Sequence, residues 1–405
     1  MSQCLICRHE VTPFMSFGRM PIANGFLTSR QFAAEPFFEL SPGFCARCKM
    51  VQLTELVDPH KMFHEHYAFF SSTSSRMAAH FEALAHHIMA WLPGAEPFVV
   101  EIGSNDGILM QHLASARIRH LGIEPSANVA AAARARGVNT ISEFFDQDLA
   151  RRIVAGYGHA DVCAGANVMC HIPSIHSVVA GVALLLKPSG VLIFEDPYLG
   201  DIIERGSYDQ IYDEHAFYFS VTALDHLFAQ HGFEIIDVDP QPTHGGSMRY
   251  TVGRAGQHQV SAATVAQRAR EQALGLGDES TYQSFRKRVE RSRLELMALL
   301  RTVRAEGKRV VGYGATSKST TVTNYCGITP DLVEFISDTT PIKQGKFSPG
   351  THIPVRPPAE FRARYPDYAL LFAWNHADEI VANERAFVAA GGKWIVYVPA
   401  VGVVA

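Results

Sequence analysis

Strand-length apolar runs alternate with segments of helical spacing through the middle of the chain. The apolar runs lie at 97–101, 119–124, 138–141, 160–164 and 190–195. The segments of helical spacing lie at 106–116, 126–136 and 174–186. Because strands and helices alternate, we expect a doubly wound sheet of mainly parallel strands. Two more apolar runs, at 233–239 and 247–253, have no helix between them and should form an antiparallel edge.

The last hundred residues repeat this alternation. A strand is predicted at 309–313 and a helix opens at 316–321, and further strands are predicted at 332–337, 368–374 and 393–398. Residues 262–306 are rich in Ala, Arg, Glu and Leu and predict two helices, because Gly275-Leu276-Gly277 interrupts the run. Residues 76–92 predict one amphipathic helix. The sequence therefore predicts two Rossmann-like domains joined by a helical connection.

The first 60 residues contain two C-x-x-C pairs. The four cysteines are Cys4, Cys7, Cys45 and Cys48. Each pair lets one turn present two sulfurs to an ion, and two such turns give the closed tetrahedral site typical of structural Zn²⁺. A redox motif is the alternative, but no thioredoxin-like βαβ pattern surrounds either pair. We therefore predict an α/β chain with a zinc-binding domain (1–66), a doubly wound domain (67–260), a helical connection (261–306) and a second Rossmann-like domain (307–405).

Composition narrows the class of protein. The chain has 405 residues, 47% of them hydrophobic and 19% charged, which predicts two or three domains with substantial cores. A net charge of −4 is not typical of a protein that coats nucleic acid. No apolar run approaches the roughly 20 residues of a membrane helix, and the N-terminus does not resemble a signal peptide. We expect a cytoplasmic monomer that binds neither nucleic acid nor membrane.

A glycine-bearing turn follows the first central strand. Glu101 to Gly107 has the spacing E-x-G-x-x-x-G, which differs from the G-x-G-x-x-G of dinucleotide-binding proteins. It resembles the first motif of S-adenosylmethionine (SAM) methyltransferases, in which glycines such as Gly103 leave room for the methionine half of SAM. In those enzymes an acidic residue ending the second strand, here Glu124, binds the ribose hydroxyls. Asp106 can cap the next helix. A βαβ turn without a cofactor is the alternative.

Two junctions at the carboxyl ends of later strands are unusually polar. One is 166–173, which contains Asn167 and His171, and the other runs from 195 to 220. The second packs acids, tyrosines and one histidine, including Tyr212, Glu214 and His215, into about 25 residues, unlike an ordinary turn. Loops at this edge of a doubly wound sheet build binding sites, so we expect function here, with an aromatic lid as the alternative.

Tyr67 lies in a segment that also contains three histidines, at 60, 64 and 66. The segment enters the central domain just before its first helix, so Tyr67 could lie over the cofactor. A metal site built from these histidines is not expected, because no carboxylate and histidine pair at helical spacing supports it.

Three other segments could bind an anion such as a phosphate. Residues 244–249 contain two glycines and an arginine that can bind an anion through two N–H groups. Residues 312–321 place glycines, hydroxyls and a lysine at the start of a helix, and residues 338–346 form a polar loop. The candidate residues are His244, Ser247, Arg249, Lys318 and Lys343. The first segment also makes sense as a hairpin turn and the second as an ordinary strand-to-helix turn, and the second does not have Walker spacing.

Together these residues resemble the SAM-dependent sugar C-methyltransferases, most closely the C-3'-methyltransferases that act on dTDP-linked 4-keto-deoxysugars. The resemblance rests on both C-x-x-C pairs and on 101–107, 166–173, 195–220, 244–249, 312–321 and 337–354. It implies a zinc-binding N-terminal domain, a SAM-binding middle domain and a C-terminal domain that helps bind a nucleotide sugar. SAM binding should then use Glu101, Gly103, Asp106, Glu124 and Asn167. The motifs fix neither the nucleotide nor the substituent at C-3'.

The resemblance also implies catalytic roles for five residues: Tyr67, His171, Tyr212, Glu214 and His215. Methylation at carbon requires a carbon nucleophile, and the proton on C-3' is acidic because a ketone lies beside it. We expect His215 to remove that proton, Tyr212 and His171 to stabilise the enolate, and Glu214 to orient the base or contact the sugar. The alternatives are an O- or N-methyltransferase, a nicotinamide oxidoreductase and a non-enzymatic zinc adaptor.

Overall fold

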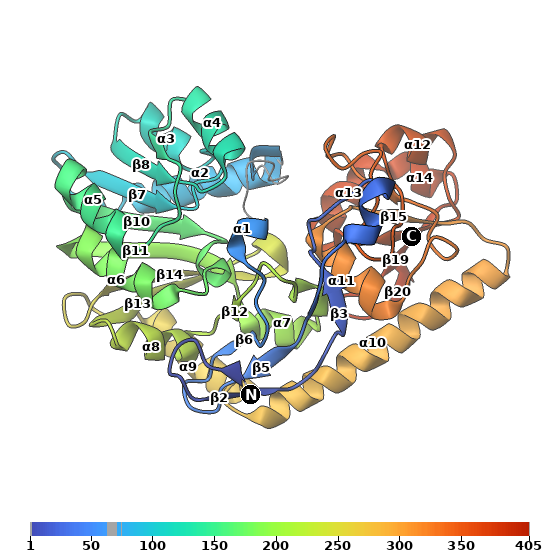
Figure 1. Cartoon of the computed structure of the whole chain (residues 1–405), viewed down its shortest axis with the longest axis horizontal. Helices are drawn as coiled ribbons and strands as arrows, with labels where there is room; N and C mark the ends of the chain where they lie inside the picture. Colours follow the sequence, from blue (N-terminus) through green and yellow to red (C-terminus); the bar gives the residue numbers. More distant parts are fainter. Residues whose placement is uncertain (1, 63–70, 74, 405) are drawn as a thin grey trace.

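The computed structural model describes residues 2–62, 71–73 and 75–404. Within this part of the chain, a central and a C-terminal sheet lie on opposite sides of the molecule, and the N-terminal strands lie below and between them (Figure 1). The predicted fold class, α/β with two Rossmann-like sheets behind a small cysteine-bearing N-terminal sheet, is confirmed.

The central sheet contains both the predicted parallel strands and the predicted edge. In chain order the strands are β7 (Phe98–Ile102), β8 (Arg119–Ile123), β9 (Thr140–Ile141), β10 (Ala160–Ala166), β11 (Leu186–Pro197), β13 (Phe233–Gln241) and β14 (Ser247–Arg254). Their spatial order is β13-β14-β11-β10-β7-β8-β9. The pairs from β11 to β9 are parallel, whereas β14 is antiparallel to both β11 and β13. The carboxyl ends of the parallel strands therefore meet at one edge.

Helices flank this sheet. They are α2 (Ser75–Met89), α3 (Met110–Ser115), α4 (Ala127–Ala135), α5 (Gln147–Tyr157), α6 (Ile175–Leu185), α7 (Leu199–Arg205) and α8 (Val221–Ala229). Helix α5 was not predicted, although Asp146 caps it by accepting a hydrogen bond from the Leu149 amide at 2.8 Å. Helix α3 begins later than predicted, because the residues before it form a turn in which Gly103, Asn105 and Gly107 all have positive φ.

The N-terminal region is made of short strands and turns. Its strands are β1 (Ser2–Gln3), β2 (Glu10–Pro13), β3 (Arg19–Pro21), β4 (Phe37–Glu39), β5 (Pro42–Phe44) and β6 (Val51–Leu53), and its helices are η1 (Ser29–Ala34) and α1 (Pro59–Met62). A strand from the middle of the chain, β12 (Phe217–Tyr218), completes the sheet of β1, β2, β5 and β6 by pairing antiparallel with β6. The region therefore shares a sheet with the long loop that follows β11.

Two helices connect the central domain to the C-terminal domain, as predicted. Helix α9 (Ala262–Leu274) ends at Gly275, whose left-handed φ of 67° suits glycine, and α10 (Glu279–Ala305) then runs beneath the molecule to the C-terminal sheet (Figure 1). The C-terminal strands are β15 (Val310–Tyr313), β16 (Ile336–Ser337), β17 (Val355–Arg356), β18 (Tyr368–Leu371), β19 (Lys393–Val396) and β20 (Gly402–Val404). All pair in parallel except β19 with β20.

The remaining elements are short. The C-terminal helices are α11 (Ser317–Cys326), α12 (Pro358–Ala363), α13 (Ala377–Asn383) and α14 (Arg385–Ala389). Single 3-10 turns are η2 (Ser71–Thr73), η3 (Met169–His171), η4 (Tyr208–Gln210), η5 (Thr243–Gly245) and η6 (Trp374–His376). Four of them, η3 to η6, carry residues used below.

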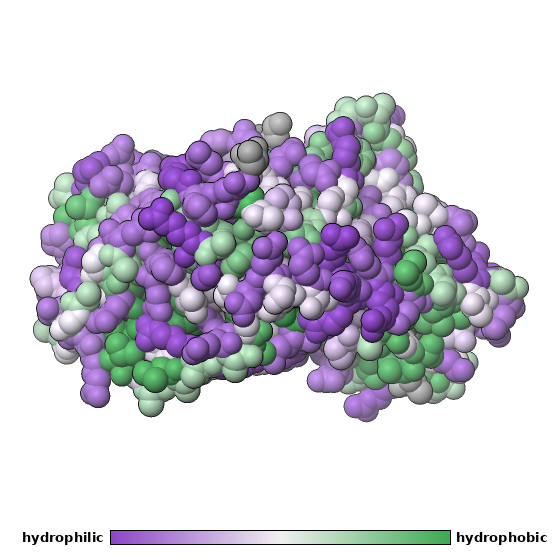
Figure 2. Space-filling view, turned by 90° about the horizontal axis from the view of Figure 1, so that it is seen from below, coloured by the Kyte–Doolittle hydropathy of each residue, from purple (hydrophilic) through white to green (hydrophobic). Residues whose placement is uncertain are grey.

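The surface is mainly hydrophilic on the face seen from below, where apolar side chains gather in small patches towards the two ends (Figure 2). Within the described ranges, no helix has the length and apolar character needed to cross a bilayer.

Candidate active site

A cavity of about 840 Å³ opens between the central and C-terminal sheets. Its lining residues follow the carboxyl ends of β7, β8, β10 and β11 on one side and of β15 and β16 on the other. The predicted site residues that line it are Glu101, Gly103, Glu124, Asn167, His171, Tyr212, Glu214, His215, His244, Lys318 and Lys343. Asp106, Ser247 and Arg249 are not among its lining residues, and Tyr67 lies outside the described residues.

Two buried glutamates form one end of the cavity, which we call the glutamate end. Glu124 follows β8, and its two oxygens accept hydrogen bonds from the amides of Asn105 at 3.0 Å and Ser126 at 2.8 Å. Gly103 lies beside it with a φ of 68°, and a Cβ there would come within 2.6 Å of Val168 Cγ2. The turn therefore requires glycine for both its conformation and its packing.

Glu101 and Asn167 each leave an acceptor at this end without a partner among the described residues. These acceptors are Glu101 Oε2 and Asn167 Oδ1, and both atoms are buried. Burial raises the pKa of the Glu101 carboxyl well above its ordinary value, and the carboxylates of Glu124 and Asp106 raise it further. A cationic ligand bound here would reduce the repulsion among these carboxylates. SAM carries positive charge on its ammonium and sulfonium groups, so the residues present fit it.

Asp106 does not cap α3, contrary to the prediction. The N-cap position is Leu109, which makes no side-chain cap hydrogen bond. The Asp106 carboxylate instead accepts hydrogen bonds from the amide and hydroxyl of Ser72 and lies 3.0 Å from Arg136 Nη1. Asp106 therefore ties the segment before α2 to the turn at the glutamate end and does not face the cavity.

His215 lies in the long loop after β11, which we call the histidine loop (residues 208–216). Its Nδ1 lies 2.8 Å from the carbonyl oxygen of Gln210. A carbonyl only accepts, so Nδ1 must carry the proton and Nε2 is left as the acceptor. Burial lowers the pKa of His215 well below its ordinary value, and the neighbouring His171, His244 and Lys318 lower it further. The imidazole is therefore neutral at pH 7 and can accept a proton.

Two other rings surround this imidazole. His171, from η3, stacks on His215 with ring centroids 5.2 Å apart, and the Tyr212 ring centroid lies at 4.1 Å. Burial lowers the pKa of His171 to about 4, so this second imidazole is also neutral at pH 7. The structure thus brings together, from two separate loops, three of the residues predicted to act on the substrate.

The N-terminal region contributes to the same wall, which the sequence analysis did not anticipate. Asn24 lines the cavity, and its Nδ2 donates to Glu214 Oε1 at 3.1 Å. The amide of Ala23 donates to Asp213 Oδ1 at 2.9 Å, and the carbonyl of Ala23 accepts from Thr320 Oγ1 at 2.8 Å. No local sequence signal marks Asn24, because its place depends on contacts with residues about 190 and 297 positions away.

The C-terminal domain supplies two buried lysines. Lys318 Nζ donates to the His244 carbonyl at 3.2 Å and to Asn375 Oδ1 at 3.1 Å, and burial lowers its pKa to about 8. Lys343 Nζ donates to the Ala315 carbonyl at 2.9 Å, and burial lowers its pKa as well. Both side chains line the cavity opposite the glutamate end. An anion bound here would stabilise the charged form of both lysines, which burial disfavours.

Ser247 and Arg249 are not among the residues that line the cavity, so its geometry does not support the prediction that they bind phosphate. Both belong to β14, and Arg249 Nη2 lies 2.6 Å from the buried Glu195 Oε1 while Nη1 lies 3.4 Å from Asp239. Ser247 Oγ donates to the carbonyl of Thr243 at 3.1 Å. These side chains hold the sheet edge together. Of the three predicted residues in 244–249, only His244 lines the cavity.

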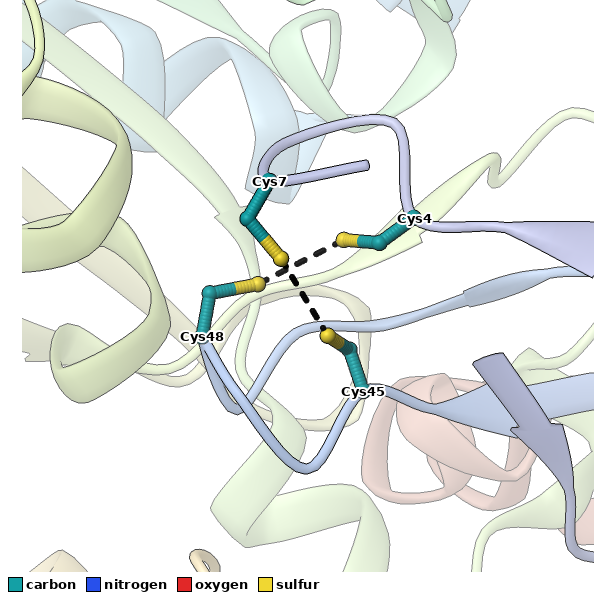
Figure 3. A group of neighbouring side chains, drawn as sticks. All are labelled: Cys4, Cys7, Cys45 and Cys48. Carbon is teal, nitrogen blue, oxygen red and sulfur yellow. Dashed lines mark hydrogen bonds between the residues drawn. The ribbon is translucent and has the colours of Figure 1, made fainter. Parts of the chain in front are cut away.

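The four cysteines of the N-terminal region converge on one point (Figure 3). Cys4 Sγ lies 3.4 Å from Cys48 Sγ, Cys7 Sγ lies 3.4 Å from Cys45 Sγ, and all four sulfurs are within 4.8 Å of one another. Sulfurs around a tetrahedral Zn²⁺ with bonds of about 2.3 Å are separated by about 3.8 Å, so the cluster fits zinc with little adjustment. Since all four positions are cysteines, the ion would be structural.

Comparisons with known proteins match three segments of the chain. Family profiles match residues 4–63 (a zinc binding domain), 59–238 (methyltransferase domain) and 242–399 (C-methyltransferase C-terminal domain). The C-methyltransferase NovU of Streptomyces niveus is 36% identical over 403 residues, which cover 98% of this chain and 96% of NovU.

Solved structures of methyltransferases match less of the chain. Magnesium protoporphyrin IX methyltransferase of Synechocystis PCC 6803 with bound SAM is 16% identical over 44% of this chain and 79% of its own, with a TM-score of 0.34. A SAM-dependent methyltransferase of Archaeoglobus fulgidus is 14% identical over 40% and 72%, with a TM-score of 0.33. The profiles and the identity to NovU, by contrast, span nearly the whole chain: it belongs to the C-methyltransferase family of SAM-dependent methyltransferases, with an N-terminal four-cysteine zinc-binding domain.

Proposed function

We propose that this enzyme transfers a methyl group to C-3' of a nucleotide-linked 4-keto-deoxysugar, with dTDP as the carrier. The observation that carries the proposal is His215, a neutral imidazole with its proton held on Nδ1, in a cavity with acids at one end and two lysines opposite. A base in a cavity that two lysines also line suits a substrate that is both a ketone and a diphosphate.

Proton removal is assigned to His215. Its Nε2 takes the proton from C-3', leaving an enolate whose negative charge lies mainly on the C-4' oxygen. Imidazole is too weak a base to do this alone, so donors must stabilise that oxygen, and we assign the Tyr212 hydroxyl and the His171 imidazole to this role. Glu214 is assigned to the substituent at C-3' or to the orientation of the base. Tyr67 remains a predicted contributor.

The other ends of the cavity bind and orient. Glu101, Gly103, Glu124 and Asn167 would hold SAM, which supplies the methyl group to the nucleophilic carbon. Asp106 stabilises their turn from behind. Lys318 and Lys343, together with His244, would hold the sugar diphosphate. Methylation of oxygen or nitrogen is the alternative, but it would not require an enolate or a base aimed at carbon.

The test is incubation with SAM and a dTDP-linked 4-keto-6-deoxyhexose, followed by mass spectrometry and NMR of the product. The proposal predicts one added methyl group on C-3'. A methyl group on oxygen or nitrogen would contradict carbon chemistry. A methyl group on C-5', which is also adjacent to the ketone, would retain the carbon chemistry and contradict the position.

A further inference from the structure

The histidine loop is held mainly by the C-terminal domain. Asp209, in η4, is fully buried, and its Oδ2 accepts hydrogen bonds from Trp374 Nε1 at 2.6 Å and from the Tyr397 hydroxyl at 2.7 Å. Trp374 lies in η6 and Tyr397 follows β19, so both donors belong to the C-terminal domain. Hydrogen bonds to a buried carboxylate are among the stronger ones in proteins.

Neighbouring residues of the loop dock on the same domain. The Tyr208 hydroxyl lies 3.6 Å from Cys326 Sγ, and the carbonyl of Ile211 accepts from Thr321 Oγ1 at 2.9 Å. Gln210, which lies between them, donates from its side chain to the carbonyl of His244. The peptide whose carbonyl accepts the hydrogen bond from His215 Nδ1–H is therefore fixed on both sides.

We propose that Asp209 is a positioning residue for the base: through Trp374 and Tyr397, the C-terminal domain holds the Gln210 carbonyl that selects the tautomer and orientation of His215. The domain would then do more than bind the substrate, because it would complete the catalytic loop of the other domain. This inference rests on the proposed role of His215. It assigns a function to Asp209, Trp374 and Tyr397, none of which lines the cavity. Trp374 also contacts a lining residue, because Lys318 Nζ lies 5.0 Å from the centre of its ring.

The first test measures proton removal alone. The dTDP-linked 4-keto-6-deoxyhexose is incubated in D₂O without SAM, and deuterium entering C-3' is followed by NMR. Trp374→Phe and Tyr397→Phe each delete one donor to Asp209, and each should slow exchange by about 10-fold, because a displaced base loses reactivity steeply. SAM affinity, measured by calorimetry, should stay within about twofold of wild type because the glutamate end is untouched.

A matched control is available in the same domain. The Tyr313 hydroxyl donates to the buried Glu384 at 2.9 Å, away from the histidine loop, so Tyr313→Phe removes an equivalent hydrogen bond. It should leave exchange unchanged. At Asp209 itself, Asn keeps an oxygen that both donors can reach, so Asp209→Asn should exchange faster than Asp209→Ala.

The second test needs no substrate. The protein is labelled with ¹⁵N-histidine, and the NMR signal of His215 is assigned as the one missing from His215→Gln. In wild type this signal should show the Nδ1–H tautomer. The Trp374→Phe/Tyr397→Phe double variant should lose that signature. Unchanged tautomer and exchange in folded variants would overturn the inference. If wild type shows no C-3' exchange but the variants change the tautomer, the positioning role stands and the proposed reaction fails.

Discussion

The glutamate end of the cavity is built mainly from one stretch of chain, to which the loop after β10 adds Asn167, whereas the wall around His215 is assembled from three regions. Glu101, Gly103 and Glu124 lie within 24 residues, and backbone amides of the same stretch fix Glu124. The histidine loop is instead held by Ala23 and Asn24 on one side and by C-terminal residues on the other. Binding of SAM and removal of the proton should therefore respond to different parts of the molecule.

Loss of zinc should have the largest effect on this contrast. Replacing Cys4 and Cys45 by Ser removes two of four thiolates, and structural zinc contributes about 10 kcal/mol or more to the folding of small domains. The N-terminal sheet contains β12, which directly follows the histidine loop, so turnover should be abolished while SAM binding persists. Metal analysis should find about one zinc in wild type and none in the variant. A zinc-free protein with normal turnover would contradict the structural role.

Removal of the base should have the next largest effect. We expect His215→Ala to lower kcat by at least about 100-fold, the lower range for a general base, with SAM affinity unchanged. His226 is exposed on α8, so His226→Ala is the matched control and should keep wild-type turnover. Near-normal turnover by His215→Ala would remove His215 from the role.

Replacement of Glu124 should have the opposite effect to replacement of His215: it should weaken SAM binding and leave proton removal intact. We expect Glu124→Ala to weaken SAM binding by about 10-fold, the value of a hydrogen bond to a charged group, while C-3' exchange without SAM continues at the wild-type rate. The exposed Glu82→Ala serves as the control for calorimetry. If Glu124→Ala lost C-3' exchange to the same extent as SAM binding, the glutamate end and the wall around His215 would not be independent.

The pH profile should show the smallest and most graded effect. His215 acts only when neutral, and its pKa is lowered by burial from the ordinary 6.5, so kcat should fall only as the pH drops below 6.5. Lys318 binds anions only when charged, and its pKa is about 8, so the KM for the nucleotide sugar should rise as the pH increases through 8. An acid limb centred above 6.5 would contradict a neutral buried base.

The same contrast explains what the sequence could predict. The parallel pair β7 and β8 at the glutamate end follows from local alternation of strand and helix, and the spacing of the two C-x-x-C pairs indicates the four metal ligands. The positions of Asn24, Asp209 and Tyr397 could not be predicted, because their partners are distant in sequence. Asn24 contacts Glu214, 190 residues away, and Asp209 contacts Tyr397, 188 residues away. Arg249 looked like a phosphate ligand because its sequence neighbours are glycines, but Glu195 on the adjacent strand neutralises it.

The central claim, that carbon is methylated after His215 removes a proton, is tested most directly by deuterium entry at C-3' of the dTDP-linked 4-keto-6-deoxyhexose in D₂O without SAM. We expect exchange with wild type, little exchange with His215→Ala, and conversion to a C-3'-methylated product when SAM is added. Absence of exchange in wild type, together with a product methylated on oxygen or nitrogen, would contradict it.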